Sequence, residues 1–363
     1  MNSPFPYERL PNADEFFGRT KELEKLSTIT KYSNNLLIHS KRRMGKSSLI
    51  KTFFEQNKDD YLCIYVDIFD ITSKEDFAQL LLKALANAGK FDLKTAIKNL
   101  TSLFKRVRVE PTIDPNTLEY LIKPIVATLS FEEMFEEFFN SLNELSKTNK
   151  IILSIDEFQQ IANITDVKLD AMMRKYIQEK QNISYIFLGS KRHLLTSLFE
   201  YKAPLYELAT HFELKPLDLT DVFEYAKKYL DISLEMCQYL YEKSDGETKM
   251  IQQILHLLYV QKEKIITKEE IDTVIKEIIN SKDSSYKLLF DTLGNNQKIA
   301  LKIVGIYKSG VFASSILTQY NIKKQTLQSS IDTLLKKELI DKEDDRYFIP
   351  DRTFELWVEG LNG

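Results

Sequence analysis

The sequence predicts an α/β fold in which a parallel β-sheet has helices on both faces and is followed by a helical lid and a C-terminal winged-helix domain. Short apolar segments typical of buried strands alternate with helical segments up to about residue 215. Such alternation favours parallel strands joined by crossover helices. From Pro216 to about residue 281 the pattern is purely helical, and three further helices with two short extended segments then follow.

The strands that we expect are residues 36–39, 61–67, 151–155, 183–188 and 211–214. Helices fill the intervals between them. One helix opens with Ser130 and Glu133, and the last helix of the lid opens with Thr267 and Glu270. Both pairs have the spacing of a capping box, in which each residue satisfies a backbone N–H group of the other.

Four parts are expected along the chain. Residues 1–15 form an extended arm, because their three prolines disfavour a helix. Residues 16–215 form the sheet domain, 216–283 the lid and 284–363 the winged-helix domain. In the last part, helices at 297–308, 313–320 and 324–337 precede a hairpin, which is the pattern of a winged helix.

Residues 89–129 interrupt the alternation and look like a surface insertion. They are rich in Lys, Thr and Asn and contain three prolines. A solvated loop or a helical hairpin is one interpretation, since surface loops tolerate insertions at low cost. A surface that contacts a protein partner is the other.

The composition excludes several classes of protein. A formal net charge of −3 argues against a globally basic nucleic-acid coat. Cys63 and Cys237 lie far apart in apolar segments, so we expect reduced core residues and not a disulfide or a metal site. The sequence shows no apolar signal core and no run of 18 apolar residues. We therefore expect a cytoplasmic protein.

Residues 35–50 are the most informative segment. An apolar strand leads into a basic turn, then Gly45, Lys46 and Ser47, then an apolar helix. This is the layout of a phosphate-binding P-loop, in which Gly45 admits the phosphates, Lys46 contacts them and the Ser47 hydroxyl binds Mg²⁺. The predicted nucleotide-binding residues here are Ser40, Lys41, Arg42, Arg43, Met44, Gly45, Lys46, Ser47 and Ser48. The alternative, an ordinary Gly-Lys-Ser turn, is disfavoured by the strand–loop–helix context.

Ser40 departs from the usual pattern, because it stands where the first glycine of a P-loop is expected. Serine is compatible with that position if its backbone does not need a positive φ angle. A P-loop at this segment therefore requires that Ser40 does not have a positive φ.

A second motif completes the expected site. Residues 150–157 form an apolar strand that ends in Asp156 and Glu157. A P-loop needs such a strand beside it, because an Asp at its tip holds Mg²⁺ together with the P-loop serine. Glu157 fits the base that activates the attacking water. The alternative is an acidic helix N-terminus, but the presence of both motifs favours a site for ATP and Mg²⁺.

Taken together and in this order, the motifs resemble the archaeal-type ATPase family, a branch of the AAA+-like signalling ATPases. The resemblance spans nearly the whole chain and is carried by Phe17-Gly18-Arg19, Arg43-Met44-Gly45-Lys46-Ser47, Asp156-Glu157-Phe158-Gln159, Gly189-Ser190, Ala203-Pro204-Leu205-Tyr206 and Gly246. It implies that the arm and the Gly-Arg segment surround the adenine, through Phe5, Phe17, Gly18 and Arg19. It also implies that Ser190 touches the γ-phosphate or the water, although a serine after a strand is more often a turn residue.

The sequence departs from this family at three places. Glu207-Leu208 replaces a Gly-Arg pair, Gly246-Glu247-Thr248 replaces Gly-x-Pro, and Lys249 stands where related ATPases have an arginine. No arginine occurs between Arg192 and Arg346. An arginine finger accelerates hydrolysis by about 10³–10⁵, so we expect slow turnover unless Lys249 takes that role. Lys249 is equally compatible with a solvated lid lysine.

Two functions are consistent with these features. The first is a switch ATPase whose nucleotide state repositions the winged helix and so controls a partner. The second is an ATP-dependent DNA-binding protein of the origin-recognition or transposition-helper type. In the second, DNA contacts come from Lys323, Lys324, Gln325, Thr326 and Gln328 at the start of the third helix. The acidic wing, with Asp341, Glu343, Asp344 and Asp345, would repel phosphates, so a winged helix that binds protein is an equal alternative.

Overall fold

The computed structural model describes residues 3–88, 99–114, 120–190, 192–261, 265–307, 309–343 and 346–361. The chain forms two compact units, each assembled from separate segments. We call Thr20–Ser40 with Lys46–Leu214 the sheet unit, and Met1–Arg19, Lys41–Gly45 and Lys215–Gly363 the helical unit. Among the described residues, no helix is both long and apolar enough to cross a membrane.

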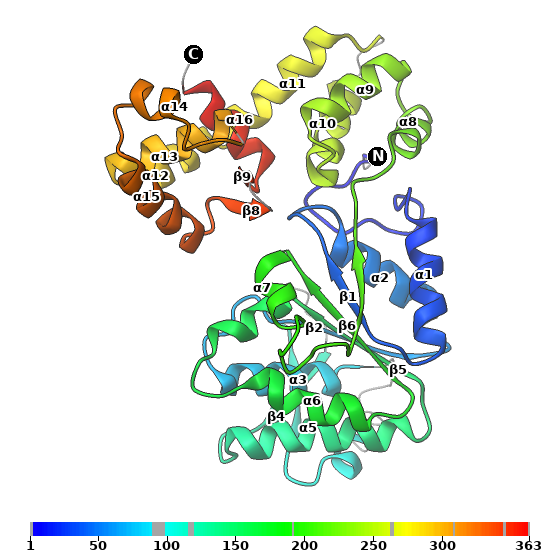
Figure 1. The fold of residues 1–363 in the computed structure, drawn as a ribbon. Helices are drawn as coiled ribbons and strands as arrows, with labels where there is room; N and C mark the ends of the chain where they lie inside the picture. The colour runs from blue at the N-terminus through cyan, green and yellow to red at the C-terminus, as the bar shows by residue number, and fades with distance from the viewer. Residues whose placement is uncertain are drawn as a thin grey trace. The chain divides into compact units, whose positions relative to one another are not determined.

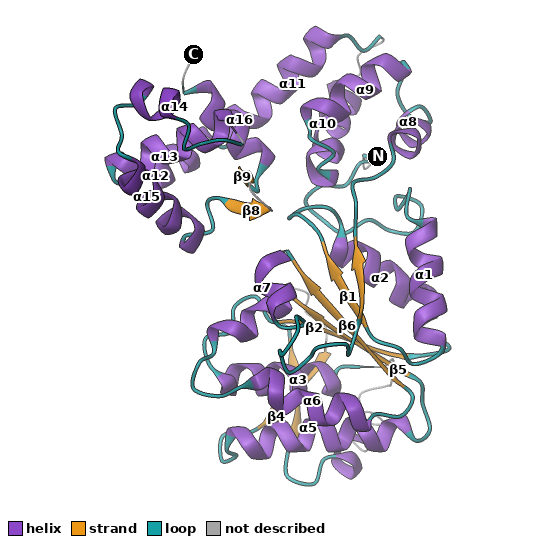
Figure 2. Ribbon diagram, viewed as in Figure 1, coloured by secondary structure: helices purple, strands orange, loops and turns teal. Residues whose placement is uncertain are grey.

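The sheet unit is built on five parallel strands in the order β2-β5-β6-β1-β7 (Figures 1 and 2). Their bounds are β1 Leu36–His39, β2 Leu62–Asp67, β5 Ile151–Asp156, β6 Ile183–Gly189 and β7 Thr210–Glu213. All five predicted strands are present within one or two residues. The three inner strands β1, β5 and β6 are buried along their whole length, as expected for a parallel sheet that is covered on both faces.

Helices pack on the two faces of this sheet (Figure 1). One face is covered by an apolar core shared with α3, α5 and α6, and α1 with α2 lies on the other side. The helix bounds are α1 Thr20–Lys31, α2 Lys46–Asn57, α3 Lys74–Ala86, α5 Phe131–Ser146, the 3-10 helix η1 Phe158–Asn163, α6 Leu169–Glu179 and α7 Arg192–Ser197. The predicted capping box at the start of α5 is present, with Ser130 and Glu133 bonded reciprocally.

The insertion at 89–129 differs from both a solvated loop and a helical hairpin in its described residues. Its residues 99–103 are helical, and it contains an antiparallel hairpin of β3 Arg108–Ile113 and β4 Tyr120–Ile125. Asn87, at the end of α3, forms two 2.9 Å hydrogen bonds with the backbone of Ile122 in β4. The strands were missed because prolines interrupt their pattern. Residues 89–98 and 115–119 lie outside the described parts.

The lid segment of the helical unit contains α8 Leu219–Ala226, α9 Leu234–Lys243, α10 Thr248–Gln261 and α11 Lys268–Ser281. The capping box of Thr267 and Glu270 opens α11, as predicted. The N-terminal arm belongs to the same core, since Phe5 is fully buried there. Its ring makes edge contacts with Tyr225, Tyr229 and Tyr259.

The winged helix is confirmed by its elements. Its bounds are α13 Asn295–Tyr307, α14 Ser314–Gln319, α15 Lys324–Lys336, β8 Asp341–Glu343 and β9 Arg346–Phe348. Two helices were not predicted, α12 Asp283–Asp291 and α16 Arg352–Gly360. The Asp351 side chain caps α16 by accepting hydrogen bonds from the N–H groups of Thr353 and Phe354. This cap and the apolar residues that follow it are the signal that could have predicted α16.

Both cysteines carry free thiols. Burial raises the pKa of the Cys63 thiol to about 12 and that of Cys237 to about 11. Since the thiolate is the reactive form, both groups are chemically quiet at neutral pH.

Candidate functional site

The carboxyl ends of β2 and β5 concentrate negative charge in the sheet unit. Asp67 pairs in register with Asp156, and Glu157 follows directly. Burial, together with the nearby charges of Asp156 and Glu157, raises the pKa of the Asp67 carboxyl despite a backbone hydrogen bond that lowers it. Among the described residues, however, no group of three or more His, Cys, Asp or Glu side chains is placed to hold a metal ion, so a cation here needs further oxygen ligands.

Two hydroxyl groups are directed at Asp156, which is almost fully buried. Ser47 Oγ donates to Asp156 Oδ2 over 2.6 Å, and the Tyr65 hydroxyl donates to the same oxygen over 2.5 Å. Burial first, and then the Asp156 charge, raise the pKa of Tyr65, so that the phenol remains a donor. The two residues predicted to hold Mg²⁺ are therefore in contact, and they fit the ion because both offer oxygen ligands. Tyr65 was not predicted from the sequence.

Glu157 has a left-handed backbone, with φ 54° and ψ 39°. Such a conformation is uncommon for a residue other than glycine and indicates local strain. Its Oε2 atom accepts hydrogen bonds from Ser190 Oγ, over 3.1 Å, and from Gln159 Nε2. The predicted base and Ser190 thus lie together at the ends of β5 and β6, although they are 33 residues apart in sequence.

Ser40 contacts the P-loop lysine. Lys46 Nζ donates to Ser40 Oγ over 3.2 Å, and both side chains are buried. Ser40 is not among the residues with a positive φ, in agreement with the prediction. A glycine at this position would lack the hydroxyl that orients Lys46. Ser48 lies partly buried in the first turn of α2.

The P-loop turn Lys41–Gly45 packs within the helical unit. Arg43 and Gly45 have φ angles of 64° and 89°. A Cβ atom at Gly45 would meet nothing within 4 Å, so glycine is needed there for its conformation and not for space. The Arg43 carbonyl accepts from the Lys249 N–H over 3.2 Å, and the Met44 carbonyl accepts from Arg19 and Thr248.

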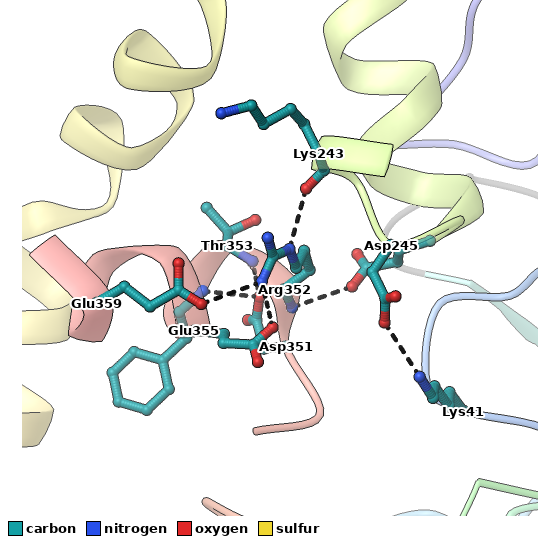
Figure 3. Close-up of polar contacts among 10 residues, drawn as sticks. Lys41, Lys243, Asp245, Asp351, Arg352, Thr353, Glu355 and Glu359 are labelled. Atoms are coloured by element: carbon teal, nitrogen blue, oxygen red, sulfur yellow. Dashed lines mark hydrogen bonds and ion pairs between the residues drawn. The ribbon is translucent and has the colours of Figure 1, made fainter. Parts of the chain in front are cut away.

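Three consecutive cations of this turn each pair with a carboxylate of the helical unit. Lys41 pairs with Asp245 of the lid at 3.1 Å (Figure 3), and Arg42 pairs with Glu338, just after α15, at 2.5 Å. Arg43 Nη1 lies 2.6 Å from Asp351 Oδ1 and 3.7 Å from Glu247 Oε1. Burial lowers the pKa of Arg43, but these two carboxylates raise it by more.

Arg352, at the start of α16, joins the winged helix to the lid (Figure 3). Its backbone N–H donates to Glu247 over 3.2 Å and its Nε donates to the Lys243 carbonyl over 2.9 Å. Its guanidinium also pairs with Glu355 and Glu359. Beside this network is a cavity of about 510 Å³, lined by residues that include Lys41, Arg42, Glu343, Arg346 and Phe348.

Glu247 is the most perturbed acid of this network. Burial raises the pKa of its carboxyl to about 7, even though Arg43 and the Arg352 N–H both lower it. The side chain is 4% exposed. Its protonation therefore changes near neutral pH, and with it the charge that faces Arg43.

The residues expected around the adenine all lie in the helical unit. Phe17 stacks on Tyr225 with ring centroids 4.0 Å apart, Gly18 has a φ of 68° beside Leu217, and Arg19 is buried against the Met44 carbonyl. Phe5 is enclosed by tyrosines, as described above. These contacts give each residue a role in packing, and contact with a base stays a prediction.

The departures from the family pattern have structural counterparts. Glu207, where the family has glycine, has a φ of 60°, a left-handed conformation that glycine adopts more readily. Gly246 also has a positive φ, and a Cβ atom there would come within 2.8 Å of Pro216. Lys249 lies partly exposed in the first turn of α10, and a role toward the γ-phosphate stays a prediction.

The residues predicted to contact DNA lie at the N-terminal end of α15. Lys323 is the N-cap residue, and Lys324 and Gln325 are exposed. Thr326 is partly exposed, and the Gln328 side chain donates to Asp332 over 2.8 Å. The end of the helix is therefore accessible. Asp344 and Asp345 of the wing lie outside the described residues.

Comparisons with known proteins identify two domain families in this chain. Residues 16–254 match a family described as an ATPase domain predominantly from Archaea, and residues 284–360 match a winged-helix domain family. No curated protein matches this chain.

Many solved structures share the fold, and three of them are archaeal proteins that match over nearly the whole chain. A Walker-type ATPase of Pyrococcus abyssi has a TM-score of 0.66 at 18% identity, over 98% of this chain and 99% of that one. The ORC2 protein of Aeropyrum pernix, in complexes with ADPNP and ADP, has a TM-score of 0.55 at 11% identity, over 99% and 98%. The ORC1 protein of Aeropyrum pernix, in complex with DNA, has a TM-score of 0.50 at 12% identity, over 98% and 95%.

These likenesses establish the fold, and the family match extends over both the P-loop and the Asp156-Glu157 strand. The chain belongs to the family of ATPase domains found predominantly in Archaea.

Proposed function

We propose that this protein is a switch ATPase that binds Mg·ATP at the P-loop, hydrolyses it slowly and uses its nucleotide state to reposition the winged helix. The observation that carries the proposal is the pairing of three consecutive P-loop cations with carboxylates of the lid and winged helix. A triphosphate bound at the same loop competes with those carboxylates for the same positive charges.

The residues of the sheet unit supply the chemistry. Ser47 and Asp156 are the proposed ligands of Mg²⁺, which when bound neutralises charge that develops on the phosphate oxygens. Lys46 contributes a cation to the phosphates. Glu157 accepts the proton of the attacking water as a general base, and its carboxylate is already held by Ser190.

The ion pairs of the turn give a physical basis for the switch. A ligand shifts a conformational equilibrium through contacts that differ between the two states. When phosphates engage Lys41 and Arg43, the hold on Asp245 and Asp351 weakens, and α16 with the winged helix gains freedom to move. After hydrolysis the γ-phosphate is gone, and the carboxylates recover their partners.

Slow turnover follows from the absence of an arginine between Arg192 and Arg346 in the sequence. A partner that is controlled by the winged helix, or that binds the hairpin of the insertion, would receive the signal. The β3–β4 hairpin contributes exposed residues, including Ile113 and Tyr120, to such a surface.

A second candidate function is ATP-dependent DNA binding, favoured by the exposed Lys323 and Lys324 at the N-terminal end of α15. One structure of similar fold, the ORC1 protein of Aeropyrum pernix, was solved in complex with DNA.

The P-loop assignment predicts that Lys46→Ala weakens Mg·ATP binding at least tenfold, because hydrogen bonds to charged groups contribute about 1.5–3 kcal/mol.

Glu157→Gln should bind ATP as the parent does but lower kcat by about 10²–10⁴, since an amide cannot accept the proton. Titration calorimetry and phosphate release measure the two effects. Lys58→Ala, which alters an exposed lysine paired with Glu55, is the control. Equal ATP affinity in Lys46→Ala would refute the site.

If the triphosphate and the Asp351 carboxylate compete for Arg43, Asp351→Asn should tighten ATP binding about two- to fivefold, because Arg43 loses its nearest carboxylate. The size of the effect follows from partly exposed ion pairs, which contribute up to about 1 kcal/mol. Asparagine preserves the cap of α16. Asp332→Asn, which alters a carboxylate bonded to Gln328 of its own helix, is the matched control. Unchanged or weaker binding in Asp351→Asn would contradict the competition.

The raised pKa of Glu247 predicts a pH dependence of stability. The folded state binds this proton more tightly than the unfolded chain, whose glutamate has a pKa near 4.5. The contribution of Glu247 is therefore full below about pH 4.5 and decreases up to about pH 7, with a slope of at most about 1.4 kcal/mol per pH unit. Urea unfolding followed by the fluorescence of Trp357 measures it, since the chain has one tryptophan. Glu247→Gln should remove this slope, and an unaltered slope would show that another group titrates.

DNA binding through α15 predicts an apparent affinity that falls steeply with salt, because phosphate contacts release counterions. Lys323→Ala with Lys324→Ala should reduce that slope by about two. Fluorescence anisotropy with labelled duplex DNA, in ATP and in ADP, measures it, and Lys336→Ala at the other end of the helix is the control. Absence of binding at low salt would exclude this function.

A further inference from the structure

Gln159 is a buried polar residue to which the proposed reaction has so far given no role. It ends the Asp156-Glu157-Phe158-Gln159 tetrad and lies in η1, two residues after the proposed base. Its side chain is 1% exposed. An amide is seldom buried so completely unless its hydrogen bonds serve a purpose.

The amide nitrogen of Gln159 serves Glu157. Gln159 Nε2 and Ser190 Oγ both donate to Glu157 Oε2. The two donors come from different elements, η1 and the end of β6. Both bonds end on Oε2, so two donors from different elements restrain the orientation of the carboxylate.

The burial of the Gln159 amide oxygen is energetically unfavourable. Among the described residues, Gln159 Oε1 has no hydrogen-bond partner. It lies directly against Gly189, where an added Cβ atom would be 2.2 Å from it. A side chain at position 189 would therefore displace the amide. Gly189 does not have a positive φ, so space is what requires glycine there, first for Gln159 and next for Leu195, whose Cδ2 would be 3.0 Å from the added atom.

The backbone of Glu157 is a second unfavourable feature, because this residue adopts a left-handed conformation. Strained backbone and buried polar groups without partners both lower stability, and both persist at functional sites when the surroundings enforce them. Here the two unfavourable features support the same carboxylate, which is the observation that favours function over packing alone.

We propose that Gln159 is a positioning residue that holds the Glu157 carboxylate in the orientation needed to accept a proton from the attacking water. This inference rests on the proposed ATPase function and adds a residue to it. Ser190 shares the task through its own hydrogen bond to Oε2. A displaced base loses rate and not affinity, because the water is activated in the transition state, after ATP is bound.

The test is Gln159→Met, which keeps the length and the apolar packing of the side chain but removes the donor. We expect kcat to fall about tenfold, while the dissociation constant of Mg·ATP stays within twofold. Gln160→Met is the matched control, because Gln160 is also buried in η1 but bonds to Asn163. It should change neither quantity. Single-turnover hydrolysis and calorimetry provide the two measurements.

Gly189→Ala is an independent second variant. It leaves the amide in the chain but pushes it away from its site, so the same loss of kcat is expected at unchanged ATP affinity. This variant keeps the inference testable if Gln159→Met does not fold.

A double-mutant cycle with Glu157→Gln separates positioning from general effects on the fold. Gln159→Met should have no further effect on kcat once Glu157 is neutral, since its role acts through that carboxylate. An unchanged or increased kcat in Gln159→Met and Gly189→Ala, with Glu157→Gln impaired, would overturn this inference and leave the proposed function intact. An unimpaired Glu157→Gln would instead overturn the proposed base itself.

Discussion

The need to neutralise Arg43 is the constraint on which the arrangement of the helical unit depends. Its side chain is partly buried, at 31% exposed, and the guanidinium keeps its proton, so nearby carboxylates balance its charge. Asp351 and Glu247 do so from the start of α16 and from the lid. Because Asp351 also caps α16 and Glu247 also accepts from the Arg352 backbone, one cation fixes the P-loop turn, the lid and the winged helix together.

In the sheet unit, the strand topology, and not an ion pair, places the proposed site residues. The carboxyl ends of parallel strands meet at one edge of the sheet. Registers that pair Asp67 with Asp156 and His39 with Gly189 bring Asp156, Glu157 and Ser190 to that edge from distant parts of the sequence. The backbone topology is therefore sufficient to place them near one another, and the hydrogen bonds to Glu157 add to that arrangement.

Local patterns explain which features could be predicted from the sequence. The buried strands and the capping boxes depend on neighbouring residues, and both were predicted within one or two residues. The β3–β4 hairpin was not, because its prolines and polar residues resemble a loop. Tyr65 and Gln159 were missed for another reason: nothing near them in sequence shows that their partners are Asp156 and Glu157. The ion pairs of Lys41, Arg42 and Arg43 likewise join residues separated by about two hundred positions or more.

The division of the chain has a consequence for its synthesis. The boundary between the two units is crossed near residues 19, 40, 45 and 214, so the arm and the P-loop turn leave the ribosome long before the carboxylates that pair with Arg43. Domains usually fold in order of emergence. The turn Lys41–Gly45 lies between two segments of the sheet unit in the sequence, but its contacts in the helical unit form only after residues 215–363 have been made. Contacts of such long range slow folding. A nascent chain that ends before Asp245 would therefore hold three adjacent cations without these carboxylates, which is a state for a chaperone or a bound anion to protect.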